Sequence, residues 1–444
     1  MSIKIGMVSL GCPKNQVDAE QMLYLLQENG FEITPDEAQA DVIIVNTCGF
    51  IDRAKKESID TILDVATLKT EGNLKALIVT GCLAERYMQD ILHELPEVDA
   101  VVGIGASKDI CRIVNEVLQN GTKQSYPADK SSLLLDGKRI LANDPYYAYL
   151  RIADGCDNCC TYCAIPAIRG RYRSRSMESI VQEAQTLAQN GVKELIVVAQ
   201  DVTRYGIDLY GELKLPALLK ELCKIDGIVW IRLLYTYPDK ITDELLEVIG
   251  QEQKIVKYLD MPLQHCNGEI LKHMNRSGDR KSLTALIQKI RRMVPDMVLR
   301  TTFIAGFPGE SEQQFEELCE FVQEIRFERM GAFAYSAEEG TVAATMPEQV
   351  EQSERTRRME LLMERQSVIN EQYNTSRVGQ TLQVLCEGYD PYIKHYYGRS
   401  AADAPDIDCK VFFRSAKKVA AGSFVFVAIS DQMEYDLLGD RVDG

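Results

Sequence analysis

Residues 154–163 read Asp-Gly-Cys-Asp-Asn-Cys-Cys-Thr-Tyr-Cys, and this loop decides how the centre of the chain is interpreted. Cys156, Cys160 and Cys163 form a Cys-x3-Cys-x2-Cys set within it. Three thiolates can ligate three irons of a [4Fe-4S] cluster and leave the fourth iron open to another ligand. Zinc is the alternative, but a structural zinc site needs a fourth protein ligand, and only Cys159 stands nearby. We therefore predict an iron–sulfur site in this loop.

Apolar runs alternate with helical patterns around and beyond this loop. Six runs have the character of buried strands, at residues 147–152, 194–199, 229–234, 256–260, 298–304 and 329–333. A closed (β/α)8 barrel needs eight such units, so the pattern predicts a partial, open barrel. Its active site is expected at the carboxyl ends of the strands, where the cysteine loop follows the first of them.

The first 120 residues show the same alternation, with strands expected at 3–10, 42–46, 76–80 and 100–102. This order predicts a doubly wound parallel sheet, and so the α/β fold class. Cys12, Cys48 and Cys82 each follow one of these strands closely, so they should converge on one edge of the sheet. Buried structural thiols are the alternative. The equivalent loop positions favour a second three-thiolate site with an open iron.

The chain changes character after a charged helix expected at residues 348–373. Short β-rich runs separated by Gly, Pro and Asp then predict a small five-stranded barrel. We accordingly expect an N-terminal α/β domain, a partial barrel, a connecting helix and a β-barrel, at residues 1–125, 142–345, 346–376 and 377–444.

Composition limits the classes of function. The 444 residues include 50 Lys and Arg against 66 Asp and Glu, a formal net charge of −16. Such a charge disfavours tight, sequence-blind binding of nucleic acid and suits a basic partner. No apolar stretch reaches the ~20 residues that span a bilayer, and we expect a soluble, cytoplasmic protein. Thirteen cysteines indicate free thiols and metal ligands rather than a disulfide framework. Four scattered histidines disfavour a His-based zinc site or a catalytic triad.

Motifs along the whole chain resemble the radical S-adenosylmethionine (SAM) methylthiotransferases. They read Ser-Leu-Gly-Cys at 9–12, Asn-Thr-Cys-Gly-Phe at 46–50, Thr-Gly-Cys-Leu-Ala at 80–84, Ala-Gln-Asp-Val-Thr at 199–203, Gly-Phe-Pro-Gly-Glu at 306–310 and Ala-Pro-Asp-Ile-Asp at 404–408. The resemblance implies two [4Fe-4S] clusters, a radical-SAM barrel and a C-terminal TRAM domain. It also implies radical insertion of a methylthio group at a C–H bond, with one SAM as the methyl source and a second cleaved to a 5′-deoxyadenosyl radical.

Two branches of this family differ in substrate. One modifies an adenosine of tRNA, and the other modifies the β-carbon of an aspartate in small-subunit ribosomal protein twelve. Gly-Cys-Pro-Lys-Asn at 11–15 and the arginine-rich run at 165–175 are similar to the ribosomal branch. Acidic residues dominate the tail at 431–443, which should repel tRNA and attract a basic protein, free or in the assembled subunit.

A two-cluster electron-transfer protein is a rival from another class. Such proteins fill all four ligand positions of each cluster, whereas each cysteine set here stops at three. The sulfur source and the electron donor are not indicated by the sequence.

Further site residues are implied by the resemblance. The candidate cofactor-binding residues are Tyr162, Gln200, Asp201, Arg232, Gln264, Gly306, Phe307 and Pro308. Ordinary loop packing, strand capping and turn geometry are the alternatives. The alternating residues Arg169, Arg171, Arg173 and Arg175 would share one face of an extended segment and hold a cofactor carboxylate or the target aspartate. Ion pairs with the protein's own acids are the alternative, and no catalytic residue is expected beyond the clusters.

Overall fold

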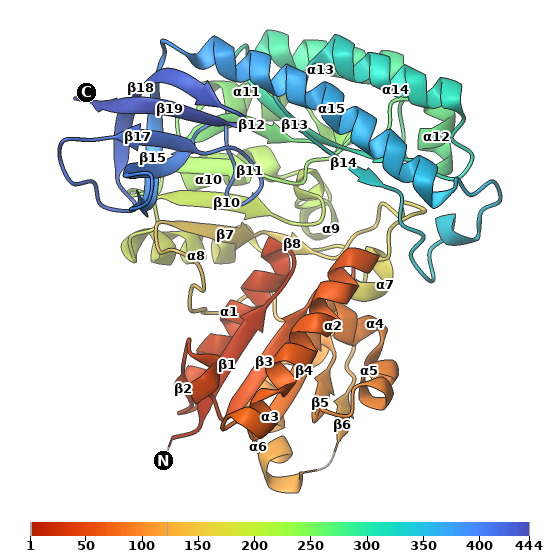
Figure 1. Cartoon of the computed structure of the whole chain (residues 1–444), viewed down its shortest axis with the longest axis vertical. Helices are drawn as coiled ribbons and strands as arrows, with labels where there is room; N and C mark the ends of the chain where they lie inside the picture. Colours follow the sequence, from red (N-terminus) through yellow and green to blue (C-terminus); the bar gives the residue numbers. More distant parts are fainter. Residues whose placement is uncertain (1, 122, 444) are drawn as a thin grey trace.

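The computed structural model describes residues 2–121 and 123–443. Two parallel sheets of six strands each are followed by a closed barrel of five strands. Figure 1 shows the N-terminal sheet in red and orange, with the carboxyl ends of its strands directed toward the second sheet. The expected α/β class with a small C-terminal barrel is confirmed.

The N-terminal sheet has the strand order β2-β1-β3-β4-β5-β6. Its strands are β1 (Lys4–Ser9), β2 (Glu32–Ile33), β3 (Val42–Thr47), β4 (Ala76–Gly81), β5 (Ala100–Val102) and β6 (Gln124–Tyr126). Every residue of β3 and β4 is buried, as a parallel sheet covered on both faces requires. The short edge strands β2 and β6 were missing from the sequence prediction because two or three residues carry no readable alternation.

Helices cover both faces of this sheet. Met22, Leu26, Ile113 and Val117 pack against one face, and Ile62, Leu83 and Ile91 pack against the other. The helices are α1 (Pro13–Glu28), α2 (Asp52–Ala66), α3 (Leu68–Glu71), α4 (Cys82–Arg86), α5 (Met88–Glu94) and α6 (Ile110–Asn120). The doubly wound arrangement predicted from the sequence is therefore present.

The second sheet has the order β14-β13-β12-β11-β10-β7 and remains open between its edge strands β14 and β7. Its strands are β7 (Tyr147–Arg151), β10 (Glu194–Val198), β11 (Trp230–Leu233), β12 (Ile255–Asp260), β13 (Val298–Ala305) and β14 (Arg329–Ala334). A two-stranded ribbon, β8 (Ala153–Asp154) with β9 (Arg173–Ser174), flanks the cysteine loop. The partial barrel of six parallel strands is confirmed.

The outer face of the second sheet is covered by the helices that connect its strands. These helices are α8 (Met177–Gln189), α10 (Leu215–Cys223), α11 (Asp243–Gln251), α12 (Gly268–His273), α13 (Arg280–Met293) and α14 (Glu312–Ile325). Two short helices lie elsewhere: α7 (Ile165–Arg169) packs against Cys82, and α9 (Ile207–Tyr210) contacts β9. The charged helix predicted after them is α15 (Gln352–Arg377), and it lies along the same layer in Figure 1. Leu362 and Ile369 are its buried contacts with this core.

The C-terminal strands close into a barrel with the order β15-β16-β17-β19-β18. They are β15 (Thr381–Asp390), β16 (His395–Ser400), β17 (Val411–Arg414), β18 (Phe424–Met433) and β19 (Asp436–Val442). No helix among the described residues is both long enough and apolar enough to cross a membrane.

The C-terminal barrel is fixed to the inner face of the second sheet by rings and by a buried ion cluster. The rings of Trp230 and Phe424 meet edge to face with centroids 4.7 Å apart. Glu194 on β10 accepts from Arg232 on β11 at 2.8 Å and from Arg399 on β16 at 2.7 Å, and all three side chains are almost completely buried. Burial acts to raise the pKa of Glu194, but the two guanidinium groups outweigh it and hold this pKa below its ordinary value.

We predict that Glu194→Ala lowers the free energy of unfolding by about 3–5 kcal/mol, because two buried guanidinium groups lose their shared carboxylate. Denaturant unfolding checks this. Since the pKa of Glu194 is depressed in the folded state, its contribution is present above the ordinary Glu pKa of ~4.3 and is lost as the pH falls below it. Asp440→Ala, which breaks the exposed pair with Arg414, is the control and should cost less than about 1 kcal/mol. Equal losses in the two variants would contradict the prediction.

Candidate functional site

The N-terminal cysteines lie together at the carboxyl edge of the first sheet. Cys12 directly precedes α1, Cys48 directly follows β3, and Cys82 is the first residue of α4. The loops approach so closely that a Cβ added to Gly11, where φ is +92°, would lie 2.8 Å from the Cβ of Cys48. A Cβ added to Gly49 would lie 2.7 Å from the backbone of Leu83. Glycine is therefore needed where these cysteine loops meet.

Charge distinguishes the three thiols. Burial raises the pKa of Cys82 to about 12 and also raises the pKa of Cys48. At Cys12 burial acts in the same direction, but Lys14 and Arg169 outweigh it and the pKa is lowered. Thiols bind metal as thiolates, so cations beside the cysteine set favour the form that a metal needs.

The second cysteine set lies in the loop between β8 and α7. The guanidinium of Arg276 reaches to 3.8 Å from Sγ of Cys160, and the hydroxyl of Tyr237 lies 3.7 Å from the same sulfur. Burial raises the pKa of Cys156 to about 11 and that of Cys163 to about 12. Cys159 is exposed and has a positive φ of 50°.

The chemistry of the donor sets fits an iron–sulfur cluster. Each set offers three cysteine thiols at neighbouring loop positions. Three thiolates can bind three irons of a [4Fe-4S] cluster and leave the fourth iron open.

The two cysteine sets meet at one junction. Cys82 packs against Ala164 and Ile168, and Ala164 is the residue that follows Cys163. Arg169, at the end of α7, brings Nη2 to 3.8 Å from Sγ of Cys82. The carboxyl edges of both parallel sheets are therefore directed toward the same region.

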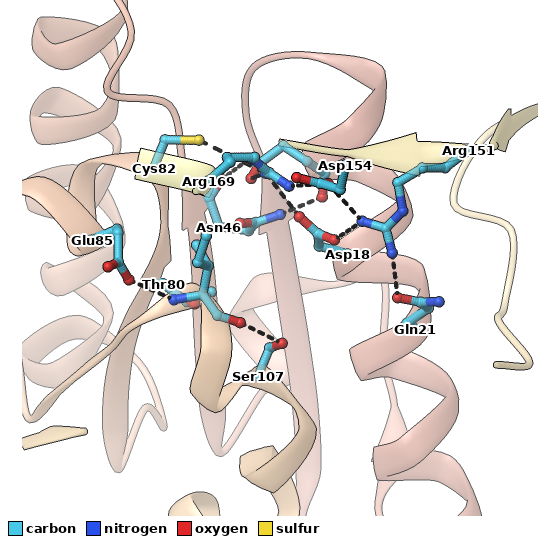
Figure 2. A network of polar contacts seen from close by, with 12 residues as sticks. Asp18, Gln21, Asn46, Thr80, Cys82, Glu85, Ser107, Arg151, Asp154 and Arg169 are labelled. Carbon is cyan, nitrogen blue, oxygen red and sulfur yellow. Dashed lines mark hydrogen bonds and ion pairs between the residues drawn. The ribbon is translucent and has the colours of Figure 1, made fainter. Parts of the chain in front are cut away.

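A buried ion network holds this junction, and Figure 2 shows it. Arg169 pairs with Asp18 on α1 at 2.8 Å and with Asp154 on β8 at 2.9 Å. Arg151 on β7 pairs with the same two carboxylates and donates to Gln21 at 3.0 Å. Burial acts to raise the pKa of Asp154, but Arg169 and Arg151 outweigh it and the pKa is lowered. Asp154 stands two residues before Cys156, so the network reaches both cysteine sets.

The prediction that four arginines share one face of an extended segment is wrong. Arg169 ends helix α7, and Gly170 turns the chain with a φ of +76° before β9. Arg171 is exposed beside Asp157, and Arg173 donates to the backbone carbonyls of residues 130 and 131. Arg175 is buried and pairs with Asp136 and Glu183. The helix and the turn place each guanidinium in a different direction, so the alternation in the sequence does not produce a shared face.

Gln200 and Asp201 lie beside the second cysteine set. Asp201 accepts from the side-chain amide of Asn158, a residue of the cysteine loop, at 2.9 Å, and it also caps the turn at Thr203. Burial raises its pKa. The side-chain oxygen of Gln200 and Nε of Arg204 are buried without a hydrogen-bond partner among the described residues. Orphaned polar atoms beside the loop fit a polar ligand that would pair with them.

A cleft of about 530 Å³ opens next to this loop, and Tyr162 and Gln264 line it together with residues 50–53 of the N-terminal unit. The ring of Tyr162 also meets that of Phe307 edge to face, with centroids 6.5 Å apart. Gln264 has a positive φ of 71° and forms a bridge to Phe303 on β13. Tyr162 and Gln264 therefore face a space bounded by both units.

The turn Gly306-Phe307-Pro308 follows β13, and the side chain of Glu310, two residues later, stabilises the turn by hydrogen bonds. Glu310 accepts from the amide of Gly306 at 2.5 Å and from that of Phe307 at 3.0 Å. Burial raises the pKa of Glu310 to about 7. A Cβ on Gly306 would lie 2.5 Å from Arg355 of α15, so close packing explains this glycine.

Arg232 is not brought to the cysteine loop. Its partners are Glu194, the carbonyl of Ala401 and the rings of Trp230 and Tyr258, all on the side of the C-terminal barrel. The structure instead places Lys14, Asn158, Tyr237 and Arg276 at the cysteine sets. Lys14 and Asn158 had a signal, since each stands two residues from a cysteine, but nothing in the local sequence marks Arg276.

Three families match successive parts of the chain. Residues 4–103 match the family described as Uncharacterized protein family UPF0004, residues 150–322 match the Radical SAM superfamily, and residues 378–442 match the TRAM domain. The radical SAM match supports the use of an iron–sulfur cluster and SAM.

Curated relatives extend over the full chain. "Ribosomal protein uS12 methylthiotransferase RimO" of Thermoanaerobacter sp. (strain X514) is 51% identical, with 98% of this chain and 99% of that protein covered. The protein of the same name from Caldanaerobacter subterraneus subsp. tengcongensis is 52% identical, with the same coverage. Among solved structures, the radical SAM methyltransferase TsrM from Kitasatospora setae shares the fold, at a TM-score of 0.55 and 14% identity over 76% of this chain and 74% of that one. The chain therefore belongs to the RimO family of uS12 methylthiotransferases, within the radical SAM superfamily.

Proposed function

We propose that this protein inserts a methylthio group at the β-carbon of an aspartate in ribosomal protein uS12. The observation that carries the proposal is the meeting of two three-cysteine sets at one junction, where Cys82 packs against the residue after Cys163. The name shared by its full-length relatives supports uS12 as the substrate.

Each cysteine set is proposed to hold one [4Fe-4S] cluster. Cys12, Cys48 and Cys82 would hold one, and Cys156, Cys160 and Cys163 would hold the other. When bound, one cluster would hold the sulfur that is transferred, one SAM would supply the methyl group, and the other cluster would cleave a second SAM by one-electron reduction to make the hydrogen-abstracting radical.

The chain's own residues position and shield these groups. Arg276 and Arg169 place positive charge beside Cys160 and Cys82, which stabilises thiolate ligands. Gln200 and Asp201 are proposed to bind the polar end of SAM, since Gln200 keeps a buried oxygen free and Asp201 is fixed to the cysteine loop. Tyr162, Gln264 and Phe307 would pack beside its adenine. The turn at Gly306 and Pro308 is proposed to shape that side of the site.

The partner is proposed to be uS12, alone or in the assembled small subunit, and the location to be the cytoplasm. The net charge of −16 suits a basic protein better than tRNA. Part of the tail's acidity is compensated within the barrel, since Asp440 pairs with Arg414 at 2.9 Å. The domain limits 1–125, 142–345, 346–376 and 377–444 are proposed as the functional division of the chain.

Mass analysis of a strain that lacks this gene tests the substrate. The methylthio mass on uS12 should disappear, while methylthiolated nucleosides of tRNA remain. Loss of the tRNA modification with an unchanged uS12 would contradict the proposal and would assign the protein to the tRNA-modifying branch of the family.

Replacing Cys156, Cys160 and Cys163 with Ala should abolish release of 5′-deoxyadenosine, because no cluster remains to deliver the electron. Replacing Cys12, Cys48 and Cys82 with Ala should leave that release in place and abolish methylthio transfer. Chromatography of the nucleoside and mass analysis of uS12 check these outcomes. Iron content should fall from about eight to about four atoms per chain in either triple variant. Undiminished nucleoside release in the first variant would defeat the assignment.

Arg169→Met should lower methylthio transfer by about 10–100-fold, because loss of the guanidinium leaves Asp18 and Asp154 undercompensated and shifts the two cysteine sets relative to each other. Release of 5′-deoxyadenosine should persist, so more of it is formed per modified uS12. The matched control is Arg171→Met, which removes the same charge two residues later at an exposed position. Equal behaviour of the two variants would contradict a positioning role for Arg169.

A further inference from the structure

Lys14 is a buried lysine at the junction of the two cysteine sets. It lies in the first turn of α1, two residues after Cys12, and only 6% of it is exposed. Its ammonium stands 3.4 Å from the centroid of the Tyr235 ring. Tyr235 follows β11 at the carboxyl edge of the second sheet, so Lys14 extends from one sheet to the other.

Tyr235 is held firmly in this position. It has a φ of +63°, which is unusual for a residue with a side chain. Its amide donates to Asp260 at 2.9 Å, and its carbonyl accepts from the amide of Val202 at 3.1 Å. The ring therefore forms a fixed platform beneath the ammonium.

The ammonium of Lys14 lacks a carboxylate partner, although its charge favours the thiolate of Cys12. Among the residues that the structure describes, it makes neither a hydrogen bond nor an ion pair with a carboxylate, and it stands over the face of the Tyr235 ring. A ring face attracts a cation but replaces little of the hydration that the ammonium loses on burial. Such a group is expected to receive an anion.

The carboxylates around Lys14 are already engaged. Asp18 and Asp154 each pair with both Arg151 and Arg169, as Figure 2 shows. Asp260 pairs with Arg300 at 3.0 Å. No carboxylate of this region remains for Lys14 within the described part of the chain.

Two arginines also place positive charge beside the cysteine sets. Arg169 lies 3.8 Å from Sγ of Cys82 and Arg276 lies 3.8 Å from Sγ of Cys160. Lys14 makes no hydrogen bond to a cysteine sulfur among the described residues, although it is close to Cys12 in the chain. Its charge lowers the pKa of Cys12, and its nitrogen stands over the ring of Tyr235 at the edge of the second sheet.

We infer that Lys14 binds the side-chain carboxylate of the aspartate that is modified. The inference rests on the proposed function and adds the residue that selects the substrate side chain. In aspartate the carboxyl carbon is bonded directly to the β-carbon. A cation that fixes the carboxylate therefore fixes the reacting carbon beside both cysteine sets, and it disfavours an asparagine at the same position.

The test measures binding of uS12 by the anaerobically reconstituted, full-length enzyme, with uS12 carrying either Asp or Asn at the modified position. Wild-type enzyme should bind the Asp form about tenfold or more tightly than the Asn form. Lys14→Met should lose this preference by weakening the Asp complex alone, and Lys14→Arg should retain it. The matched control is Lys138→Met, which removes an exposed lysine from the face of Tyr24 and should leave the preference unchanged.

Iron content and 5′-deoxyadenosine release are measured on every variant, so that binding is compared at equal cluster loading. Equal binding of Asp and Asn uS12 by the wild type would overturn the inference without any substitution in the enzyme. A Lys14→Met enzyme that keeps the preference for the Asp form would also overturn the inference. If that enzyme keeps the preference but loses iron, Lys14 is a counterion of the cluster and does not bind the substrate. Failure of the wild type to modify uS12 at all would instead refute the proposed function.

Discussion

Two arginines and two aspartates, shared across the boundary of the parallel sheets, hold the site together. Asp18 comes from the first sheet's helix α1, whereas Arg151, Asp154 and Arg169 come from the first βα unit of the partial barrel. Each guanidinium contacts both carboxylates, so every charge in the group is paired with two opposite charges. The relative position of the two cysteine sets depends on this cluster, because Asp154 leads into one loop and Arg169 touches Cys82 of the other.

The cluster is better understood as a positioning device than as a source of stability. Removing four charged groups from water costs several kcal/mol per ion, and their mutual attraction does little more than offset that cost. A well-packed apolar junction would be at least as stable. An apolar junction would lack directional hydrogen bonds, and van der Waals contacts alone do not fix an arginine beside a thiol.

The sequence predicted those parts of the protein that depend on local patterns. Buried parallel strands are continuous apolar runs, so the central strands of both sheets were found, and cysteines one to three residues beyond a strand end share an edge by geometry. The edge strands β2 and β6 were missed because they are short.

The side-chain partners were harder to predict because they come from distant segments. Arg232 pairs with Glu194 and lies against the C-terminal barrel. No local sequence pattern predicts that Arg399 pairs with the same carboxylate. The alternation of the arginine run predicts an extended segment, whereas a short helix holds Arg169 because of its tertiary contacts. Arg276 and Tyr237 approach Cys160 from loops more than seventy residues away.

The closed barrel at the end of the chain shares a carboxylate with the sheet beneath it, and this has a consequence for how the protein can evolve. Glu194 is compensated by one arginine from each unit, and Trp230 is covered by Phe424. A barrel exchanged by recombination must bring both an arginine and an aromatic ring to the same places. Otherwise the host sheet keeps an undercompensated charge and an uncovered indole, so a barrel without these two side chains would not replace this one freely.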